Sequence, residues 1–213
     1  MKGPFITLEG IDGNGKTTQA ELLAQHLRSL RYDVLHTREP GGTETARSIA
    51  PIILDRAHRA LSPIAELFLY MADRAQHVEE VIRPHLTRGG IVLCERFSDS
   101  TLAYQGYGRG LDLEIISQLN RIATGGLRPE ITILIDLPVE EAIRRKERAA
   151  GMLDRLELEG PEFHAKVRAG YLKLAARYPD RFAVLDGSQD MKTLFQEIVA
   201  AIVPKLTKHF HQP

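Results

Sequence analysis

The 213-residue sequence contains a single cysteine, Cys94, and no tryptophan. One cysteine excludes a framework of intrachain disulfides and a zinc site built from cysteines. The chain also lacks an excess of either charge, because 28 lysines and arginines balance 28 aspartates and glutamates. A neutral chain does not have the broad basic surface with which proteins coat nucleic acids or anionic membranes. We therefore expect a protein of a reducing compartment that has neither nucleic acid nor membrane as a partner.

Long hydrophobic runs are absent as well. No uncharged stretch approaches the about 18 residues that a membrane-spanning helix needs. Residues 1–4 lead directly into a short apolar segment, without the apolar core of a signal peptide. There is no internal repeat and no linker rich in serine or glycine, and about 100 to 200 residues are typical of one domain. We expect a cytoplasmic protein made of one domain, 1–213.

Arginine is the residue type that the chain has in abundance. It accounts for 20 of the 28 basic residues, whereas lysine accounts for eight. A guanidinium group is a planar fork that binds carboxylate or phosphate through two parallel hydrogen bonds. The composition therefore favours sites for carboxylate or phosphate groups.

Short apolar segments alternate with amphipathic ones along the chain. The apolar segments have the composition of buried strands, and they are 5–8, 34–37, 91–94, 131–135 and 182–185. Apolar residues at helical spacing lie between them and predict helices near 20–30, 64–82, 115–122 and 194–202. Ser62, Asp112 and Asp190 are suited to begin helices, and Gly125 is suited to end one. Continuously apolar strands that alternate with helices predict an α/β fold, with a parallel sheet covered on both faces.

A phosphate-binding loop follows the first predicted strand. The segment Gly10-Ile11-Asp12-Gly13-Asn14-Gly15-Lys16-Thr17 matches the pattern G-x-x-x-x-G-K-[ST], between a strand and a helix as that motif requires. Backbone N–H groups of such a loop point inward at phosphate, and the start of the helix adds its positive end. We expect these residues and Thr18 to bind ATP, with Lys16 on the outer phosphates and the Thr17 hydroxyl on Mg²⁺.

The loop by itself predicts a nucleoside triphosphate site and leaves the reaction open. A GTPase needs a guanine-reading Asn-Lys-x-Asp segment, which this sequence lacks. A motor or AAA-type ATPase carries further modules for which 213 residues leave little room. These absences favour a small P-loop kinase. The alternatives that stay open are the choice among nucleotide and nucleoside kinases and, from another class, a nucleotide-binding switch protein.

Five segments, which together span most of the chain, resemble the bacterial thymidylate kinase family. They are 5–19, Thr37-Arg38-Glu39-Pro40-Gly41-Gly42-Thr43, Glu95-Arg96-Phe97, Ser100-Thr101-Leu102-Ala103-Tyr104-Gln105-Gly106 and Leu153-Asp154-Arg155-Leu156-Glu157. The second and fourth segments are much more particular to that family than the phosphate loop is. The resemblance implies a P-loop kinase fold with five parallel strands and a mobile lid. It also implies transfer of a phosphoryl group from MgATP to dTMP, in a homodimer that makes dTDP for dTTP biosynthesis.

Two arginines are expected to hold the acceptor's phosphate. Arg38 and Arg96 follow the second and third predicted strands, at the edge where a sheet of this class opens its ligand crevice. Tyr70 and Arg74 are four residues apart, so their side chains share one helix face. That spacing can bring an aromatic plane and a hydrogen-bond donor to one pocket.

The resemblance gives further residues a role in binding dTMP. It implies that Asp12 contacts the 3′-hydroxyl and that Tyr70 and Arg74 bind the base, where the family usually has phenylalanine in place of Tyr70. It implies that Tyr104 favours deoxyribose. The remaining residues that it assigns to substrate binding are Glu39, Ser100, Thr101, Gln105 and Glu157.

Two features of the sequence bear on Mg²⁺ and on the lid. The family has Asp-Arg where this chain has Glu95-Arg96, so the carboxylate expected near Mg²⁺ is one methylene longer. Gly13 stands where one branch of the family has an arginine, which favours the branch with arginines in the lid, 144–159. Such an arginine can raise the rate by ~10³-fold or more. The segment aligns in more than one way, and our choices are Arg148 and Arg155. The catalytic candidates are Asp12, Lys16, Arg96, Arg148 and Arg155.

Overall fold

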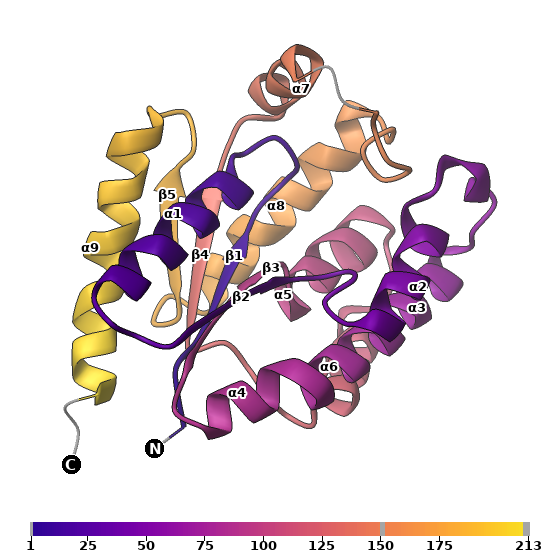
Figure 1. Ribbon diagram of the computed structural model, residues 1–213. Helices are drawn as coiled ribbons and strands as arrows, with labels where there is room; N and C mark the ends of the chain where they lie inside the picture. Colours follow the sequence, from indigo (N-terminus) through magenta and orange to yellow (C-terminus); the bar gives the residue numbers. More distant parts are fainter. Residues whose placement is uncertain (1, 150–151, 211–213) are drawn as a thin grey trace.

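Five parallel strands form the centre of the protein in a computed structural model, which describes residues 2–149 and 152–210 (Figure 1). The strand order is β2-β3-β1-β4-β5. The strands are β1 (Phe5–Glu9), β2 (Val34–Arg38), β3 (Ile91–Glu95), β4 (Ile131–Asp136) and β5 (Phe182–Asp186). All five predicted strands are confirmed, and each extends one residue further, to a charged residue. These charged ends lie along the carboxyl edge of the sheet.

Helices and helical turns connect the strands. They are α1 (Lys16–Ser29), α2 (Glu44–Leu54), η1 (Arg56–His58), α3 (Pro63–His77), η2 (Val78–Ile82), α4 (Arg83–Thr87), α5 (Ser98–Thr101), η3 (Leu102–Gly108), α6 (Leu113–Thr124), α7 (Val139–Arg148), α8 (Pro161–Arg177) and α9 (Met191–Phe210). The side chains of Ser62, Asp112 and Asp190 accept hydrogen bonds from backbone N–H groups at the starts of α3, α6 and α9, as predicted. Gly125 ends α6 in the left-handed region with φ 56°.

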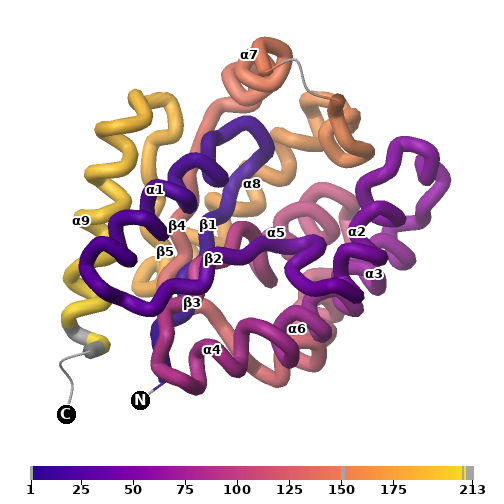
Figure 2. The backbone as a smooth tube through the Cα atoms, viewed as in Figure 1, coloured from indigo at the N-terminus to yellow at the C-terminus, as the bar shows by residue number. Residues whose placement is uncertain are grey.

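The sheet is covered on both faces. On one face α1 runs beside α9, and Ile6 and Leu8 of β1 pack against Leu23 and Ile198 from these two helices (Figure 2). The other face is covered by α8, which contacts β4 and β5, and by α4, which contacts β3 (Figure 1). Because successive residues of a strand point to opposite faces, Glu9 lies on this second face, away from Leu8. The alternation places a carboxylate in the interior between the sheet and α8.

Some predicted helical stripes do not face the core. On α3, Ile64 and Phe68 are 48% and 54% exposed, and on α6, Ile115 and Ile122 are 54% and 75% exposed. The two helices contact each other, and we call these four exposed apolar residues the α3/α6 face. Helical spacing predicted the helices, but whether a stripe meets the protein interior depends on tertiary packing.

The predicted lid, 144–159, begins within α7 and continues as a loop after it. Residues 150 and 151 lie outside the described residues. The loop from residue 152 is tied to α2, because the Arg155 N–H donates to the Leu54 carbonyl at 2.8 Å. Among the described residues, no helix is both long enough and apolar enough to cross a membrane.

Candidate active site

The phosphate loop joins β1 to α1 and is held open by Asn14. This buried side chain donates to the Ile135 carbonyl of β4 at 2.9 Å and accepts from the Lys16 N–H at 3.1 Å. Gly13 has φ 83°, and a Cβ built on it would lie 2.7 Å from the Ala142 carbonyl of α7. A side chain therefore has no room at Gly13. The residue before α1, Gly15, has no side chain that could cap the helix, and among the described residues the backbone N–H groups of Thr17 and Thr18 are left available to an anion.

Lys16, Asp12 and Arg96 form a charge cluster beside the loop. The Asp12 carboxylate lies 2.5 Å from Nη2 of Arg96 and 3.3 Å from Nζ of Lys16. Burial opposes ionisation of Asp12, but Arg96 and Lys16 outweigh it and hold the pKa of Asp12 well below its usual value. Burial, and then the positive charge of Arg96, lower the pKa of Lys16. Two cations therefore share one carboxylate, an arrangement that favours a further anion.

Arg96 adopts a conformation that is rare for a residue other than glycine. Its φ is 66°, in the left-handed region, which costs about 1 kcal/mol or more. Its guanidinium donates to the Tyr104 hydroxyl at 3.0 Å and to Ser100 Oγ at 3.2 Å, and it lies 4.8 Å from the centre of the Tyr104 ring. These contacts aim the guanidinium across the site at Asp12.

Glu9 supports the left-handed conformation of Arg96. The sequence predicted no role for this residue. Its fully buried carboxylate accepts from the Phe97 N–H at 2.8 Å, Ser100 Oγ at 2.6 Å and the Tyr171 hydroxyl at 2.9 Å. Burial, followed by the negative charge of Asp99, raises the pKa of Glu9 to about 7. The sequence feature that could have identified Glu9 is its place as a carboxylate at the end of an otherwise apolar strand. Tyr171 had no such signal, because α8 brings it from far along the chain.

An acceptor pocket of about 100 Å³ opens beside the charge cluster. All the predicted substrate residues except Arg38 and Glu157 line it. Those that the structure brings together are Asp12, Glu39, Tyr70, Arg74, Arg96, Ser100, Thr101, Tyr104 and Gln105. Asp154 and Leu156 from the predicted lid complete the wall, so this segment covers the acceptor side of the site.

Arg74 is fixed rigidly in the wall of the acceptor pocket. It is 1% exposed, and it donates to Glu39 Oε2 at 2.8 Å, Thr101 Oγ1 at 2.7 Å and Asn120 Oδ1 at 2.6 Å. Glu39 also pairs with His77 Nδ1 at 3.0 Å, so its carboxylate orients Arg74. Burial raises the pKa of Tyr70, which keeps the Tyr70 hydroxyl neutral. Asn120 and His77 are contributors that sequence reasoning missed.

Thr17 and Glu95, the predicted Mg²⁺ ligands, lie together. Thr17 Oγ1 donates to Glu95 Oε2 at 2.5 Å, and His36 Nε2 is 3.0 Å from the other carboxylate oxygen. Burial opposes ionisation of Glu95, yet the hydrogen bonds from His36 and Thr17 bring its pKa below the usual value. Mg²⁺ is commonly held by one or two protein ligands together with phosphate oxygens and water. This hydroxyl and this carboxylate fit such a site, and the longer side chain of Glu95 does not prevent it.

Arg38 lies outside the acceptor pocket, in a neighbouring cleft. It is exposed at the end of β2, and it lines a cleft of about 810 Å³ together with Thr17 and Glu95. Glu39, Pro40 and Leu54 line both this cleft and the acceptor pocket, so the two spaces adjoin. A ligand that extends from the pocket toward the phosphate loop would pass this rim.

The two lid arginines occupy different environments. Arg148 is exposed at the end of α7, whereas Arg155 is buried and donates to Glu66 Oε2 at 2.5 Å and to the Ile53 carbonyl at 2.8 Å. Glu66 also accepts from Gln105, at 2.8 Å. Glu66, missed by sequence reasoning, thus anchors the loop that follows α7. Arg155 is held on the acceptor side, which differs from its expected place over ATP.

Glu157 lies outside the acceptor pocket. It lines a small cavity of about 40 Å³ beside Ile11 and Asp12, where its carboxylate pairs with Nζ of Lys146 at 2.7 Å. Lys146 comes from α7, so this ion pair connects the two ends of the predicted lid. Because both partners are less than one-quarter exposed, the pair is partly shielded from solvent.

Comparisons with known proteins agree with this fold. The sequence model of the thymidylate kinase family matches residues 8–198. A thymidylate kinase of Geotalea uraniireducens is 50% identical over 97% of this chain and 99% of its own length, and one of Geotalea daltonii is 51% identical over 96% and 98%. The crystal structure of a thymidylate kinase from Ehrlichia chaffeensis is 35% identical, with a TM-score of 0.77 over 95% of this chain and 99% of that one.

The buried Glu9 generates a prediction about stability and pH. Glu9 has a pKa of about 7 in the folded protein and about 4.5 in the unfolded chain. Its contribution to the free energy of unfolding is therefore fully present below pH 4.5. That contribution is lost as pH rises to 7, and it amounts to about 3 kcal/mol. Glu9→Gln cannot titrate. The free energy of unfolding of the wild type, relative to Glu9→Gln, should therefore fall across this range in urea titrations.

A matched control for this experiment is Glu21→Gln, on the exposed side of α1. It measures the general effect of removing one carboxylate. Parallel pH profiles for the wild type and Glu9→Gln would contradict the assigned protonation of Glu9.

Proposed function

Because this chain belongs to the thymidylate kinase family and phosphorylates dTMP, we propose that MgATP is its phosphoryl donor and that Lys16, Arg96 and Asp12 form the centre of the reaction site. The observation that carries this proposal is the charge cluster. Two cations beside the phosphate loop are in contact with the same carboxylate, at 2.5 and 3.3 Å. That excess of positive charge matches the phosphates of a donor and an acceptor that meet there.

On the donor side, the loop N–H groups and Lys16 hold the triphosphate of ATP. Thr17 and Glu95 hold Mg²⁺, which when bound neutralises negative charge on the donor's phosphates. His36 keeps the Glu95 carboxylate turned toward Thr17. The neighbouring N–H groups at the start of α1 then position the triphosphate for in-line transfer.

On the acceptor side, Arg96 binds the phosphate of dTMP, and Arg38 approaches it from the rim of the cleft. Asp12 accepts a hydrogen bond from the 3′-hydroxyl of the sugar. For this, the Asp12 carboxylate must bind both Arg96 and the substrate at the same time. A phosphate oxygen is already a competent nucleophile near neutral pH, so no side chain needs to act as a strong base.

The thymine base fits between Tyr70 and the polar wall of the acceptor pocket. Tyr70 offers a ring for stacking, and Arg74, held by Glu39, offers a donor to a base carbonyl. Ser100 and Thr101 border the edge of the base, and Tyr104 crowds the sugar. Gln105 acts through Glu66, which it helps to hold.

The segment 144–159 acts as a lid within a single domain, 1–213. Arg155 positions the loop by pairing with Glu66, and Glu157 does so by pairing with Lys146. Arg148 is the arginine that closes on the transferred phosphoryl group. In the described part of the chain Arg148 takes part in no ion pair, so its guanidinium is available to an incoming anion.

The active protein is a homodimer of the cytoplasm, and it acts on small molecules rather than on nucleic acid or membranes. The α3/α6 face supports the dimer, because it exposes Ile64, Phe68, Ile115 and Ile122 on two adjacent helices. An exposed cluster of large apolar side chains is typical of an interface. A second copy of the chain covers the same face by two-fold symmetry. The neutral net charge supports small-molecule substrates.

The proposed reaction predicts coupled turnover. Purified protein with MgATP should release ADP when dTMP is added, and much less with CMP or UMP. Lys16→Ala should lower kcat by about 10² to 10⁴-fold, because one positioned cation on the transferred phosphate is removed. ADP release measured over a panel of acceptors tests both statements. ADP formation at the same rate without any acceptor would contradict the mechanism.

The proposed Mg²⁺ site predicts a change in metal dependence. Glu95→Gln removes the negative charge while keeping the shape, so the Mg²⁺ concentration for half-maximal activity should rise about tenfold or more. His36→Gln provides a comparison, because it alters the carboxylate's neighbour alone and should have a smaller effect. Calorimetric titration of Mg²⁺ into protein with a non-hydrolysable ATP analogue gives a second readout. An unchanged Mg²⁺ dependence would remove Glu95 from the site.

The proposed dimer predicts that Phe68→Glu yields a monomer, because it places a charge at the centre of the α3/α6 face. Sedimentation or light scattering should show a mass near 23.8 kDa for the variant and twice that for the wild type. Leu30→Glu, at a similarly exposed apolar residue that follows α1, is the control. A monomeric wild type at micromolar concentration would contradict the proposal.

A further inference from the structure

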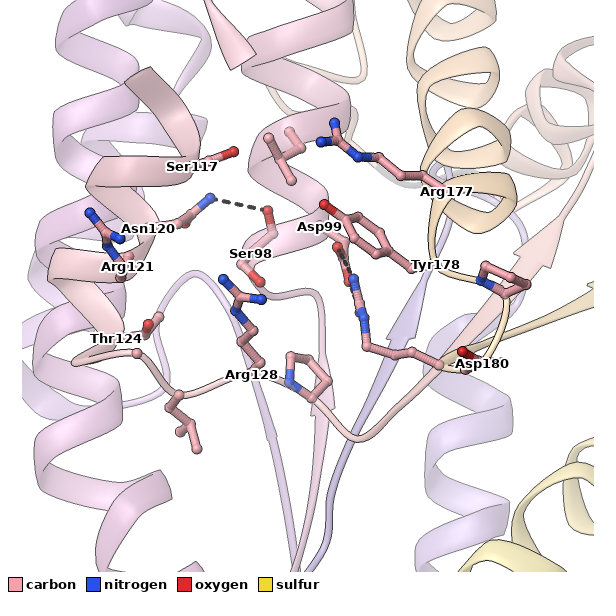
Figure 3. Close-up of a pocket in the computed structure, with 16 residues that line it drawn as sticks. Ser98, Asp99, Ser117, Asn120, Arg121, Thr124, Arg128, Arg177, Tyr178 and Asp180 are labelled. Atoms are coloured by element: carbon pink, nitrogen blue, oxygen red, sulfur yellow. Dashed lines mark hydrogen bonds and ion pairs between the residues drawn. The ribbon is translucent and has the colours of Figure 1, made fainter. Parts of the chain in front are cut away.

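A second polar cavity lies away from the reaction site. It has a volume of about 380 Å³ and is bordered by α5, α6, the loop before β4 and the turn between α8 and β5 (Figure 3). It shares no lining residue with the acceptor pocket. The arginines that line it are Arg121, Arg128, Arg177 and Arg181. These account for part of the arginine excess that the reaction site leaves unexplained.

The charges around this cavity do not cancel. Arg181 is neutralised, since it donates to both carboxylate oxygens of Asp99, at 2.6 and 2.8 Å. Arg121, Arg128 and Arg177 take part in no ion pair with any residue in the described ranges 2–149 and 152–210, and Asp180 is the other carboxylate in the lining. The wall therefore carries an excess of positive charge on a chain whose net charge is zero.

The remaining lining supplies polar groups of the kind that bind phosphate oxygens. Figure 3 shows Arg128 and Arg177 reaching into the cavity from opposite sides, with the Tyr178 hydroxyl between them. Ser98 and Asn120 lie on the inner wall, where the Asn120 amide donates to the Ser98 carbonyl at 3.4 Å. Several guanidinium groups at separate points match an anion with more than one phosphate better than they match a single carboxylate.

We propose that this cavity binds an oligophosphate anion, either free or as the phosphate chain of a small molecule. Its volume lies in the range of small-molecule sites, about 300 to 1,000 Å³. The inference goes beyond the kinase reaction, because the cavity has its own wall and needs neither ATP nor dTMP.

The cavity also has a direct structural connection to the acceptor pocket. Within the short helix α5, Ser98 and Asp99 line the cavity while Ser100 and Thr101 line the acceptor pocket. Asn120 bridges the two, since its carbonyl oxygen accepts from Arg74 at 2.6 Å. A bound anion that displaces α5 or Asn120 therefore alters the affinity for dTMP, and the coupling acts equally in both directions.

Calorimetric titration with tripolyphosphate tests the proposal. The wild type should bind two equivalents per chain, one at the phosphate loop and one in the cavity. Arg128→Ala/Arg177→Ala should lose the second equivalent or weaken it at least about tenfold, while Lys16→Ala should weaken the first. Arg59→Ala, at an exposed arginine far from the cavity in the sequence, is the matched control and should keep both. A parallel titration with GTP compares the affinity of the cavity for a nucleotide with its affinity for free tripolyphosphate. The tighter binder indicates which kind of ligand the cavity prefers.

The proposed site would be overturned if Arg128→Ala/Arg177→Ala still bound two equivalents of tripolyphosphate. It would also be overturned if the wild type bound one equivalent and Lys16→Ala bound none. Loss of phosphate-loop binding is reported separately by Lys16→Ala, so failure of the proposed donor site is distinguishable. Arg128→Lys/Arg177→Lys keeps the charge and should bind more tightly than the alanine pair. For the coupling, dTMP affinity in Lys16→Ala should change when tripolyphosphate is present, and an equal affinity would refute it.

Discussion

The contact on which the reaction site depends is the hydrogen bonding of the buried Glu9 carboxylate to the chain beside Arg96. Glu9 accepts hydrogen bonds from the Phe97 N–H and the Ser100 hydroxyl, at 2.8 and 2.6 Å, and both residues closely follow Arg96, which has the left-handed conformation. A strained residue persists when its surroundings determine it from several sides. Here that determination comes from the centre of the sheet, so the position of the guanidinium depends on the core rather than on a surface loop.

Charge balance then explains why the site suits phosphate. Among the described residues, Asp12 is the carboxylate that forms ion pairs with both Lys16 and Arg96, and burial makes each unbalanced charge more costly than it would be in water. The loop after α7 closes the acceptor side through Arg155 and Glu66, and it connects to α7 through Glu157 and Lys146. The same loop contributes Asp154 and Leu156 to the wall of the acceptor pocket, and Arg148 is exposed at the end of α7.

The short helix α5 lies between two groups of arginines. Arg74 and Arg96 serve the acceptor pocket on one side of it, and Arg128 and Arg177 face the second cavity on the other. A chain of zero net charge can therefore hold two concentrated sites for anions, because the compensating acids are distributed unevenly in space.

The sequence by itself determined the features whose cause is local. Five apolar runs predicted the strands, although each run ended one residue early, before the charged residue at the carboxyl end of the strand. The spacing of glycines and Lys16 determined the phosphate loop, because its shape depends on adjacent backbone. Tertiary structure decided which distant groups meet: Tyr171 with Glu9, Asn120 with Arg74, Arg155 with Glu66. It also decided that the α3/α6 face meets solvent. Burial and hydrogen bonding depend on neighbours that only the folded chain supplies.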